Sequence, residues 1–185
     1  MMENKKAFRN SVLDKISALS DEYIRESNDG IFRNFLSLSE YKNAATIFAY
    51  ISEKREPDTV KIIKAALSSG KRVALPVSLP GGIMEPRSIN SLDELVPGRF
   101  GIPAPPDSAP LVLRDEIDMI IVPAVTFDAN GYRLGRGGGY YDRFLAESPA
   151  FSVGLGRQRL IMPVPLESHD MNVNCLITES AVYKF

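Results

Sequence analysis

The sequence of 185 residues has little cysteine and little histidine, and each shortage removes a class of function. Its single cysteine, Cys175, cannot form an internal disulfide, so we expect the chain to work in a reducing cytoplasm. Cys175 lies among apolar residues, which predicts a buried, inert thiol rather than a nucleophile. The single histidine, His169, has no second histidine or cysteine nearby for a zinc site, so we expect it to be structural.

The chain also lacks an excess of charge and a long apolar run. A net charge of -1 argues against a general nucleic-acid binder, which would show a marked basic excess. No apolar run approaches the ~20 residues of a membrane span, and residues 1–10 have no apolar core of a signal peptide, so we expect no membrane partner. With 44% hydrophobic and 24% charged residues, the composition is that of one globular domain spanning residues 1–185, which we expect to be a monomer.

Predicted strands alternate with predicted helices along the chain. Short apolar runs typical of buried parallel strands occur at residues 47–51, 72–76, 119–125 and 151–155. Helical spacing predicts helices at residues 5–25 and 29–38, and a third that begins after a cap at Asp58 or Thr59 and ends at Gly70. The sequence therefore predicts an α/β fold: a single three-layer domain, Rossmann-like, with a largely parallel central sheet flanked by helices.

Three further segments complete this prediction. Residues 83–86 are expected to form a short strand, and residues 175–178 and 181–184 a hairpin at the sheet edge. Residues 97–110 contain five prolines, which a domain linker or a rigid loop could explain. We favour a rigid loop wrapping the domain, because too little chain remains on either side for two complete domains.

The most informative stretch covers residues 118–147. The apolar run is followed by a predicted turn at residues 128–131, a glycine cluster at residues 135–139 and helix-compatible residues. A strand feeding a glycine-rich loop that opens a helix can bind phosphate, because glycine lets N–H groups converge and the first helical turn leaves its N–H groups unpaired. The spacing is neither G-x-G-x-x-G nor that of a P-loop, and a solvated, flexible loop is the alternative.

Side chains around the glycines favour binding. Arg133, Arg136 and Arg143 add positive charge. Tyr140 and Tyr141 offer a flat apolar surface, and Asp142 directly after them offers a carboxylate.

The ten residues 133–142, RLGRGGGYYD, resemble the signature of the 5-formyltetrahydrofolate cyclo-ligase family, also called methenyltetrahydrofolate synthetases. The resemblance implies an enzyme that uses ATP and magnesium to close 5-formyltetrahydrofolate into 5,10-methenyltetrahydrofolate. Three further places match the family: the pair Lys5 and Arg9, the pair Ile51 and Glu56, and His169 with Asp170. Agreement in four separated places, in the right order, extends the resemblance over nearly the whole chain.

Two of these places also have a chemical interpretation of their own. Lys5, Lys6 and Arg9 stand at a predicted helix start, where basic residues oppose the helix dipole; they form a solvated end or point toward bound phosphate. Glu56 follows a predicted strand, and ligands of open α/β sheets gather beyond the carboxyl ends of strands. Its carboxylate can accept two N–H bonds side by side, as a pterin requires, although a surface acid is the plain alternative.

The family resemblance implies a full set of site residues. The catalytic residues would be Arg136 and Lys5. The ATP site would comprise Lys5, Lys6, Arg9, Arg133, Leu134, Gly135, Arg136, Gly137, Gly138, Gly139, Tyr140 and Tyr141. The folate site would comprise Ile51, Glu56, Phe100, Arg136, Gly137, Gly138, Gly139 and Tyr140. Asp142 and Asp170 would hold Mg²⁺ together with ATP phosphates, directly or through water.

Two departures from the family pattern and two alternative functions stay open. Gly138 replaces a lysine found in some members, so the backbone or a neighbouring arginine would take over its role, and Asn174 stands where an acid is common. A nucleotide- or folate-binding module without catalysis is one alternative, and an enzyme acting on sugar phosphates or CoA is another. The intact Arg136, Glu56 and Asp142 favour the ligase, with ATP and 5-formyltetrahydrofolate as its small-molecule substrates.

Overall fold

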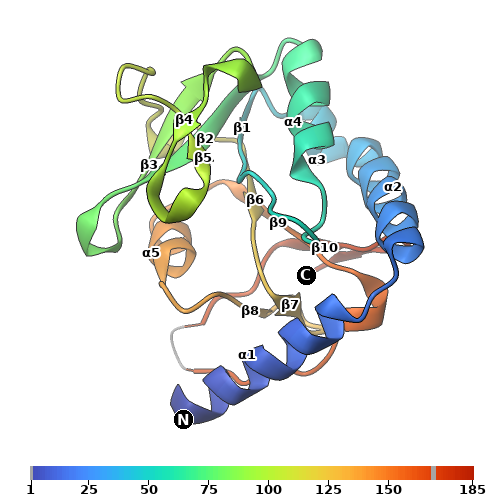
Figure 1. Cartoon of the computed structure of the whole chain (residues 1–185). Helices are drawn as coiled ribbons and strands as arrows, with labels where there is room; N and C mark the ends of the chain where they lie inside the picture. The colour runs from blue at the N-terminus through green and yellow to red at the C-terminus, as the bar shows by residue number, and fades with distance from the viewer. Residues whose placement is uncertain (1, 168–169) are drawn as a thin grey trace.

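A seven-stranded sheet forms the centre of the computed structural model, which describes residues 2–167 and 170–185, with side chains from residue 5 onward (Figure 1). The strand order is β11-β10-β9-β6-β1-β2-β3. The strands from β10 to β2 pair in parallel, while β11 and β3 are antiparallel at the two edges. The strand bounds are Thr46–Phe48 (β1), Arg72–Ser78 (β2), Met84–Ile89 (β3), Met119–Val122 (β6), Phe151–Leu155 (β9), Cys175–Ile177 (β10) and Val182–Lys184 (β11). The predicted α/β fold with a largely parallel sheet is confirmed.

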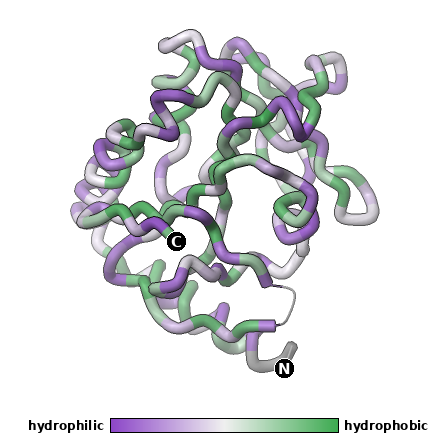
Figure 2. The backbone as a smooth tube through the Cα atoms, turned by 180° about the vertical axis from the view of Figure 1, so that it is seen from behind, coloured by the Kyte–Doolittle hydropathy of each residue, from purple (hydrophilic) through white to green (hydrophobic). Residues whose placement is uncertain are grey.

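Helices cover the two faces of the sheet unequally. One face packs against α2 (Asp21–Ser37), α3 (Ser39–Asn43) and α4 (Thr59–Ser68), and the other against α5 (Tyr140–Ala146). In β6, Met119 and Ile121 point to the face covered by α2, α3 and α4, whereas Ile120 and Val122 point to the face covered by α5. This alternation is that of a strand buried on both faces. Hydrophobic and hydrophilic residues alternate along α2, whose inner side meets the sheet (Figure 2).

The first helix, α1 (Met2–Ser17), lies apart from these layers, across the carboxyl ends of the strands (Figure 1). The prediction of one helix over residues 5–25 and a second over 29–38 was wrong. The chain breaks before Ser20, whose side chain accepts a hydrogen bond from the Tyr23 amide, and α2 begins with two acidic residues in its first turn. This N-cap starts a new helix at residue 21.

Two predicted strands end earlier than expected. The first stops at Phe48 rather than residue 51, because the Thr59 hydroxyl donates to the Tyr50 carbonyl (2.6 Å) and accepts from the Ser52 amide (3.0 Å), which turns the chain toward α4. The second, β6, stops at Val122 rather than residue 125, because Pro123 has no N–H to donate.

The sequence suggested a strand that feeds the glycine loop through a simple turn, but in the structure the loop does not follow β6 so directly. A short hairpin intervenes, formed by β7 (Thr126–Phe127) and β8 (Arg133–Leu134) around the predicted turn, which Gly131 closes with φ 81°. The loop thus starts from β8 and ends at α5.

The proline-rich segment runs along the outside of β3, as expected of a loop that wraps the domain. The Ser88 amide donates to the Pro110 carbonyl (2.9 Å), and the Val112 amide to the Pro86 carbonyl (2.8 Å). This segment includes the pair β4 (Val96–Pro97) and β5 (Pro103–Ala104). Short 3₁₀ turns occur at Pro80–Gly82 (η1), Leu92–Glu94 (η2), Arg99–Gly101 (η3), Arg114–Glu116 (η4) and Gln158–Leu160 (η5).

At the amino end of the parallel strands, one carboxylate joins two chain segments. Asp118, just before β6, accepts hydrogen bonds from the amides of Ala45 and Thr46, both at 2.8 Å. The Asp118 amide in turn donates to the Thr46 carbonyl at 3.1 Å. These bonds fix the start of β1 against the start of β6.

In the part of the chain that the structure describes, no helix is long and apolar enough to cross a bilayer.

Candidate active site

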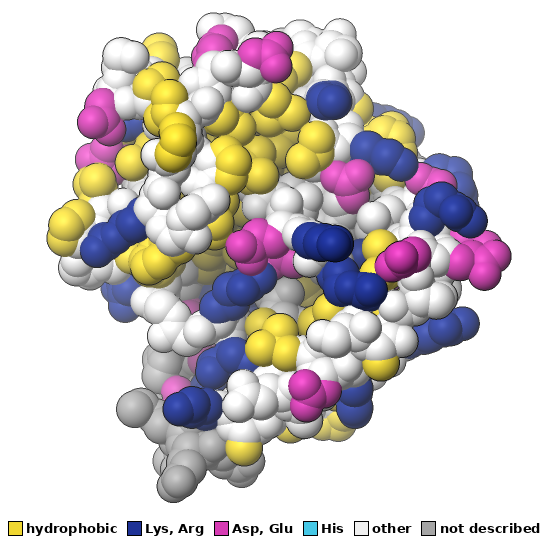
Figure 3. Space-filling model, viewed as in Figure 1, with side chains coloured by type: hydrophobic (Ala, Val, Ile, Leu, Met, Phe, Trp, Pro, Cys, Tyr) yellow, Lys and Arg dark blue, Asp and Glu magenta, His cyan; other side chains and the backbone are white. Residues whose placement is uncertain are grey.

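A cavity of about 80 Å³ lies at the carboxyl end of the sheet, where β1 has β2 on one side and β6 on the other. Such a reversal of strand order is where open α/β sheets bind ligands. The loops after three strands line it, at residues 54–57, 124–127 and 155–157, together with Leu13 and Ile16 of α1 and Arg136. Lys and Arg side chains alternate with Asp and Glu on the face above α1 (Figure 3).

The glycine loop, residues 135–139, reaches this cavity through Arg136. Gly137 (φ 97°) and Gly139 (φ 64°) adopt left-handed conformations that residues with a Cβ rarely accept. Arg9 of α1 holds the loop by donating from Nε to the Gly135 carbonyl at 2.8 Å. Because α5 has only seven residues, the positive charge of the loop comes mainly from these arginines.

Arg136 contacts Glu53 and Glu56, and we call these three residues the outer ion pair. Arg136 Nη2 lies 2.5 Å from Glu53 Oε2 and 2.8 Å from Glu56 Oε1, so the glycine loop touches the loop after β1. The Arg136 side chain is 60% exposed, whereas that of Glu56 is 17% exposed. Burial alone would lower the pKa of Arg136, but its bond to Glu56 and the nearby Glu53 charge outweigh this and raise it.

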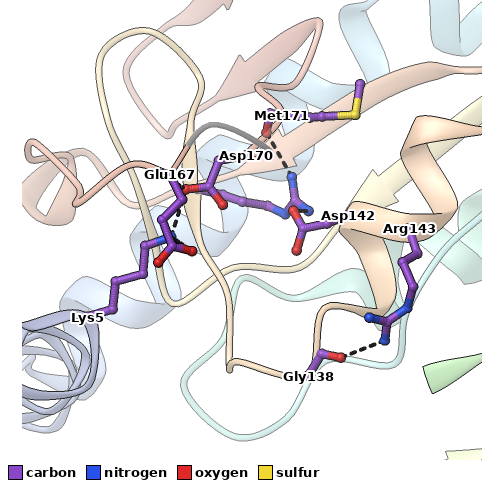
Figure 4. Close-up of polar contacts among 8 residues, drawn as sticks. Lys5, Gly138, Asp142, Arg143, Glu167, Asp170 and Met171 are labelled. Carbon is purple, nitrogen blue, oxygen red and sulfur yellow. Dashed lines mark hydrogen bonds and ion pairs between the residues drawn. The ribbon is translucent and has the colours of Figure 1, made fainter. Parts of the chain in front are cut away.

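A second group of charges, the inner charge network, lies deeper and consists of Arg133, Asp142, Lys5, Asp170 and Glu167. Arg133, whose side chain is 4% exposed, pairs with Asp142 and donates to the Met171 carbonyl at 3.0 Å. Lys5 Nζ lies 2.8 Å from Asp170 Oδ2 and 3.0 Å from Glu167 Oε2 (Figure 4). Burial lowers the pKa of Arg133, opposed by the charges of Asp142 and Asp170. The network ties α1 and the chain beside residue 170 to β8 and α5.

Arg143 reaches back from α5 to the glycine loop (Figure 4). It donates to the Gly138 carbonyl at 2.8 Å and to the Gly82 carbonyl at 3.3 Å. A Cβ at Gly82 would lie 1.9 Å from the end of the Arg143 side chain, so the guanidinium would have to move, and φ 76° is unfavourable for a residue with a Cβ. With glycine at residue 82, the guanidinium lies beside Gly138, where some family members have a lysine.

Two tyrosines line the interior next to Glu56. The Tyr141 hydroxyl is buried and has no hydrogen-bond partner among the described residues, which is a costly arrangement for a polar group. Burial raises the pKa of Tyr141, and the charge of Glu56 raises it further. Tyr50, two residues after the end of β1, is buried. Burial raises the pKa of Tyr50, and the charge of Glu56 raises it further.

The structure brings some predicted site residues together and leaves others apart. Glu56 and Arg136 line the cavity, and Lys5, Arg133, Asp142 and Asp170 meet in the inner charge network. Ile51 instead packs against the main core, and Phe100 is 69% exposed at φ 61° on a loop outside the cavity lining. Lys6 is exposed, and His169 lies outside the described residues.

Three residues that contact the predicted site residues or line the cavity were not predicted from the sequence. Glu53 and Glu167 pair with Arg136 and Lys5, and Arg157 lines the cavity from the end of β9. Arg157 lies two residues after a predicted strand, and this position is the signal that could have revealed it. Within residues 2–167 and 170–185, no three His, Cys, Asp or Glu residues cluster as a ready metal site.

A basic glycine loop beside a carboxylate-lined cavity at a strand reversal is typical of α/β enzymes that bind small anionic ligands. The model of the 5-formyltetrahydrofolate cyclo-ligase family matches residues 1–179 of this sequence. The chain belongs to this family and is an enzyme of the family's kind.

Three known proteins are similar to this chain over most of their length. The probable 5-formyltetrahydrofolate cyclo-ligase of Schizosaccharomyces pombe is 30% identical, with 97% of this chain and 95% of that protein aligned. The 5-formyltetrahydrofolate cyclo-ligase of Mycolicibacterium smegmatis is 33% identical over 85% and 84% of the two chains. The solution structure of Aquifex aeolicus 5,10-methenyltetrahydrofolate synthetase superposes with a TM-score of 0.85 at 32% identity, covering 97% of this chain and 92% of that one.

Proposed function

We propose that this enzyme closes 5-formyltetrahydrofolate into 5,10-methenyltetrahydrofolate at the expense of ATP. The formyl oxygen attacks the γ-phosphorus of ATP and ADP leaves, which gives a formyl carbon activated by an O-phosphate. N10 then attacks that carbon, loses its proton and expels phosphate, and the five-membered ring is formed. The chemistry requires no side-chain nucleophile, so the protein's task is alignment and neutralisation of charge.

The observation that carries this proposal is the contact between Arg136 and Glu56. A phosphoryl transfer from nucleotide to folate requires the phosphate-binding and pterin-binding groups to lie side by side. The guanidinium of the glycine loop and the carboxylate after β1 are 2.8 Å apart at the mouth of the cavity. Substrates that use these two groups would replace their mutual contact with contacts of their own: phosphate for Arg136, and pterin N–H donors for Glu56.

Other residues support the nucleotide side of the site. Arg9 is already held against the glycine loop at Gly135, and Arg143 against Gly138. Lys5 extends from α1 into the inner charge network, 2.8 Å from Asp170. Together with the loop amides, these cations can balance the negative charge of a triphosphate.

The carboxylates present are of the right kind for a magnesium ion. Mg²⁺ usually takes one or two protein carboxylates and completes its shell with phosphate oxygens and water. Asp142 and Asp170 fit this requirement, with Asp142 the more accessible, its side chain being 35% exposed against 13% for Asp170. Both already pair with cations, so they would bind the ion only alongside the phosphates of ATP. When bound, Mg²⁺ would neutralise phosphate charge and favour departure of ADP.

An absorbance assay tests the proposal directly. Purified protein mixed with 5-formyltetrahydrofolate, ATP and magnesium should produce the methenyl chromophore, and omission of ATP should abolish it. Chromophore formation without ATP would refute the phosphorylated intermediate, and no chromophore under any condition would refute the activity. A monomeric state and a cytoplasmic location stay predictions, which sedimentation and cell fractionation would check.

A further inference from the structure

Arg157 is a buried cation that none of the roles above uses. It lies two residues after the end of β9, lines the cavity, and is only 2% exposed. Its hydrogen-bond partners in the described part of the chain are all neutral oxygens: the Ser27 hydroxyl and the carbonyls of Ile24, Arg55 and Glu56. Its buried Nε has no hydrogen-bond partner among the described residues.

Keeping such a group in the interior is expensive. Removal of a guanidinium from water without a paired carboxylate costs free energy that neutral hydrogen bonds only partly return. Consistent with this cost, burial lowers the pKa of Arg157. The contacts that Arg157 makes therefore indicate what the group is retained for.

These contacts hold a strained loop. Arg55 has φ 75°, a left-handed conformation that is unfavourable for a residue with a Cβ. Arg157 Nη2 donates to the carbonyls of two successive residues, at 3.2 Å to Arg55 and 3.0 Å to Glu56. On the opposite side, Nη1 bonds to Ser27 in α2. The guanidinium thus joins α2 to the loop that carries Glu56.

The side chain of Arg55 holds the same loop from another direction. Its Nη1 donates to the Leu19 carbonyl at 2.8 Å, just beyond the end of α1. Within the loop, the Glu56 carboxylate accepts from the Glu53 amide at 2.8 Å. Arg157 is therefore one of three arginines that hold residues 53–56, beside Arg55 and Arg136, and among the described residues it is the one of the three that bonds to the Glu56 main chain.

The geometry points to Arg157 as a positioning residue that fixes the Glu56 carboxylate for the hydrogen-bond donors of the folate substrate. This inference rests on the proposed function for the identity of that substrate. Without Arg157, the loop can relax from the left-handed turn, and Glu56 loses its fixed place; displacements of about 1 Å can cost 10²-fold in rate. The glycine loop touches residues 53–56 through the exposed Arg136 side chain, but its backbone is held by Arg9 and Arg143, so we expect the nucleotide side to change much less.

Three variants test this role: Arg157→Met, Arg157→Lys and, as a control from the same segment, Arg159→Met. Arg159 is exposed and stacks on the Tyr23 ring at 4.1 Å, without contact to residues 53–56. For Arg157→Met we expect the KM for 5-formyltetrahydrofolate to rise about 10- to 100-fold while the KM for ATP changes less than about twofold. Arg157→Lys should lie between the wild type and Arg157→Met, and the control should match the wild type.

Hydrogen exchange gives a readout that does not depend on turnover. Amides of residues 53–56 should exchange faster in Arg157→Met than in wild type or Arg159→Met, with the sheet unchanged. If Arg157→Met does not fold, Ser27→Ala serves instead, because it removes one anchor of the guanidinium and should produce the same selective changes on a smaller scale.

Equal loss of both substrate affinities, or unchanged exchange at residues 53–56, would overturn the inference. A wild type that never forms the chromophore would refute the proposed function, whereas the exchange experiment would still decide whether Arg157 holds the loop.

Discussion

Two groups of charge flank the same glycine loop, and they differ in what surrounds them. In the inner charge network, Arg133 is 4% exposed, and its partners come from α5 and the chain near residue 171. In the outer ion pair, Arg136 is 60% exposed, and its partners are two glutamates of the loop after β1. A buried guanidinium with fixed partners holds elements together, whereas an exposed one can exchange its partners for a ligand. The two arginines with these different roles lie only three positions apart in the sequence.

The largest effect is expected at Arg133. Arg133→Met would leave Asp142 and Asp170 without their shared cation in a mostly buried place. Removal of one partner from a buried pair typically costs about 3–5 kcal/mol, so the melting temperature should fall by roughly 10 °C. Thermal unfolding followed by circular dichroism measures this. A fall no greater than that of Arg136→Ala would remove the distinction between the two groups.

Arg136→Ala should have the opposite profile. The side chain buries little area, so the melting temperature should stay within about 2 °C of the wild type. Loss of a positioned cation that stabilises developing phosphate charge should lower kcat about 10²- to 10³-fold. Parallel measurement of turnover and melting would contradict the assignment if both fell together.

The two glutamates of the outer ion pair form a matched comparison. Glu56→Gln should weaken folate binding about 10-fold and leave ATP binding nearly unchanged, because only the carboxylate accepts two N–H bonds side by side. Glu53→Gln removes the other partner of Arg136 and should change folate affinity less than about threefold. Calorimetry with each ligand alone distinguishes them; equal effects of the two changes would speak against a special role for Glu56.

The smallest effect concerns the pH dependence of the inner charge network. Burial lowers the pKa of Lys5, but its bonds to Asp170 and Glu167 outweigh this and raise it above 10.5. The stabilisation is therefore complete below pH 10.5 and is lost as the pH rises through the raised value. The difference in melting temperature between wild type and Lys5→Met, a few degrees at about pH 8, should shrink above this range. A difference that stayed constant to high pH would show that charge is not its cause.

The sequence predicted the sheet and the place of the site better than its contacts. Period and turn chemistry located the strands, and the rule that ligands bind beyond strand ends singled out Glu56, which the structure places beside Arg136. Boundaries failed where a single local bond decided them, as at Ser20 and Pro123. Neither feature changes the hydrophobic pattern of the neighbouring segment, so periodicity cannot detect it.

The pairing of charges was beyond sequence reasoning for a different reason. Lys5 and Asp170 are separated by 165 positions, and Arg157 and Ser27 by 130. Nothing local distinguishes these residues from solvated charges, since only the folded chain brings them together. The family resemblance supplied Asp142 and Asp170 as metal ligands, and that role stays a prediction alongside ATP binding.

Asp118 and its two amide partners lie at the end of the sheet opposite the cavity. The hydrogen bonds at that end align β1 with β6, and none of these residues lines the cavity. Residues around Ala45 and Asp118 are therefore the first place to seek substitutions that stiffen the sheet without touching the candidate site.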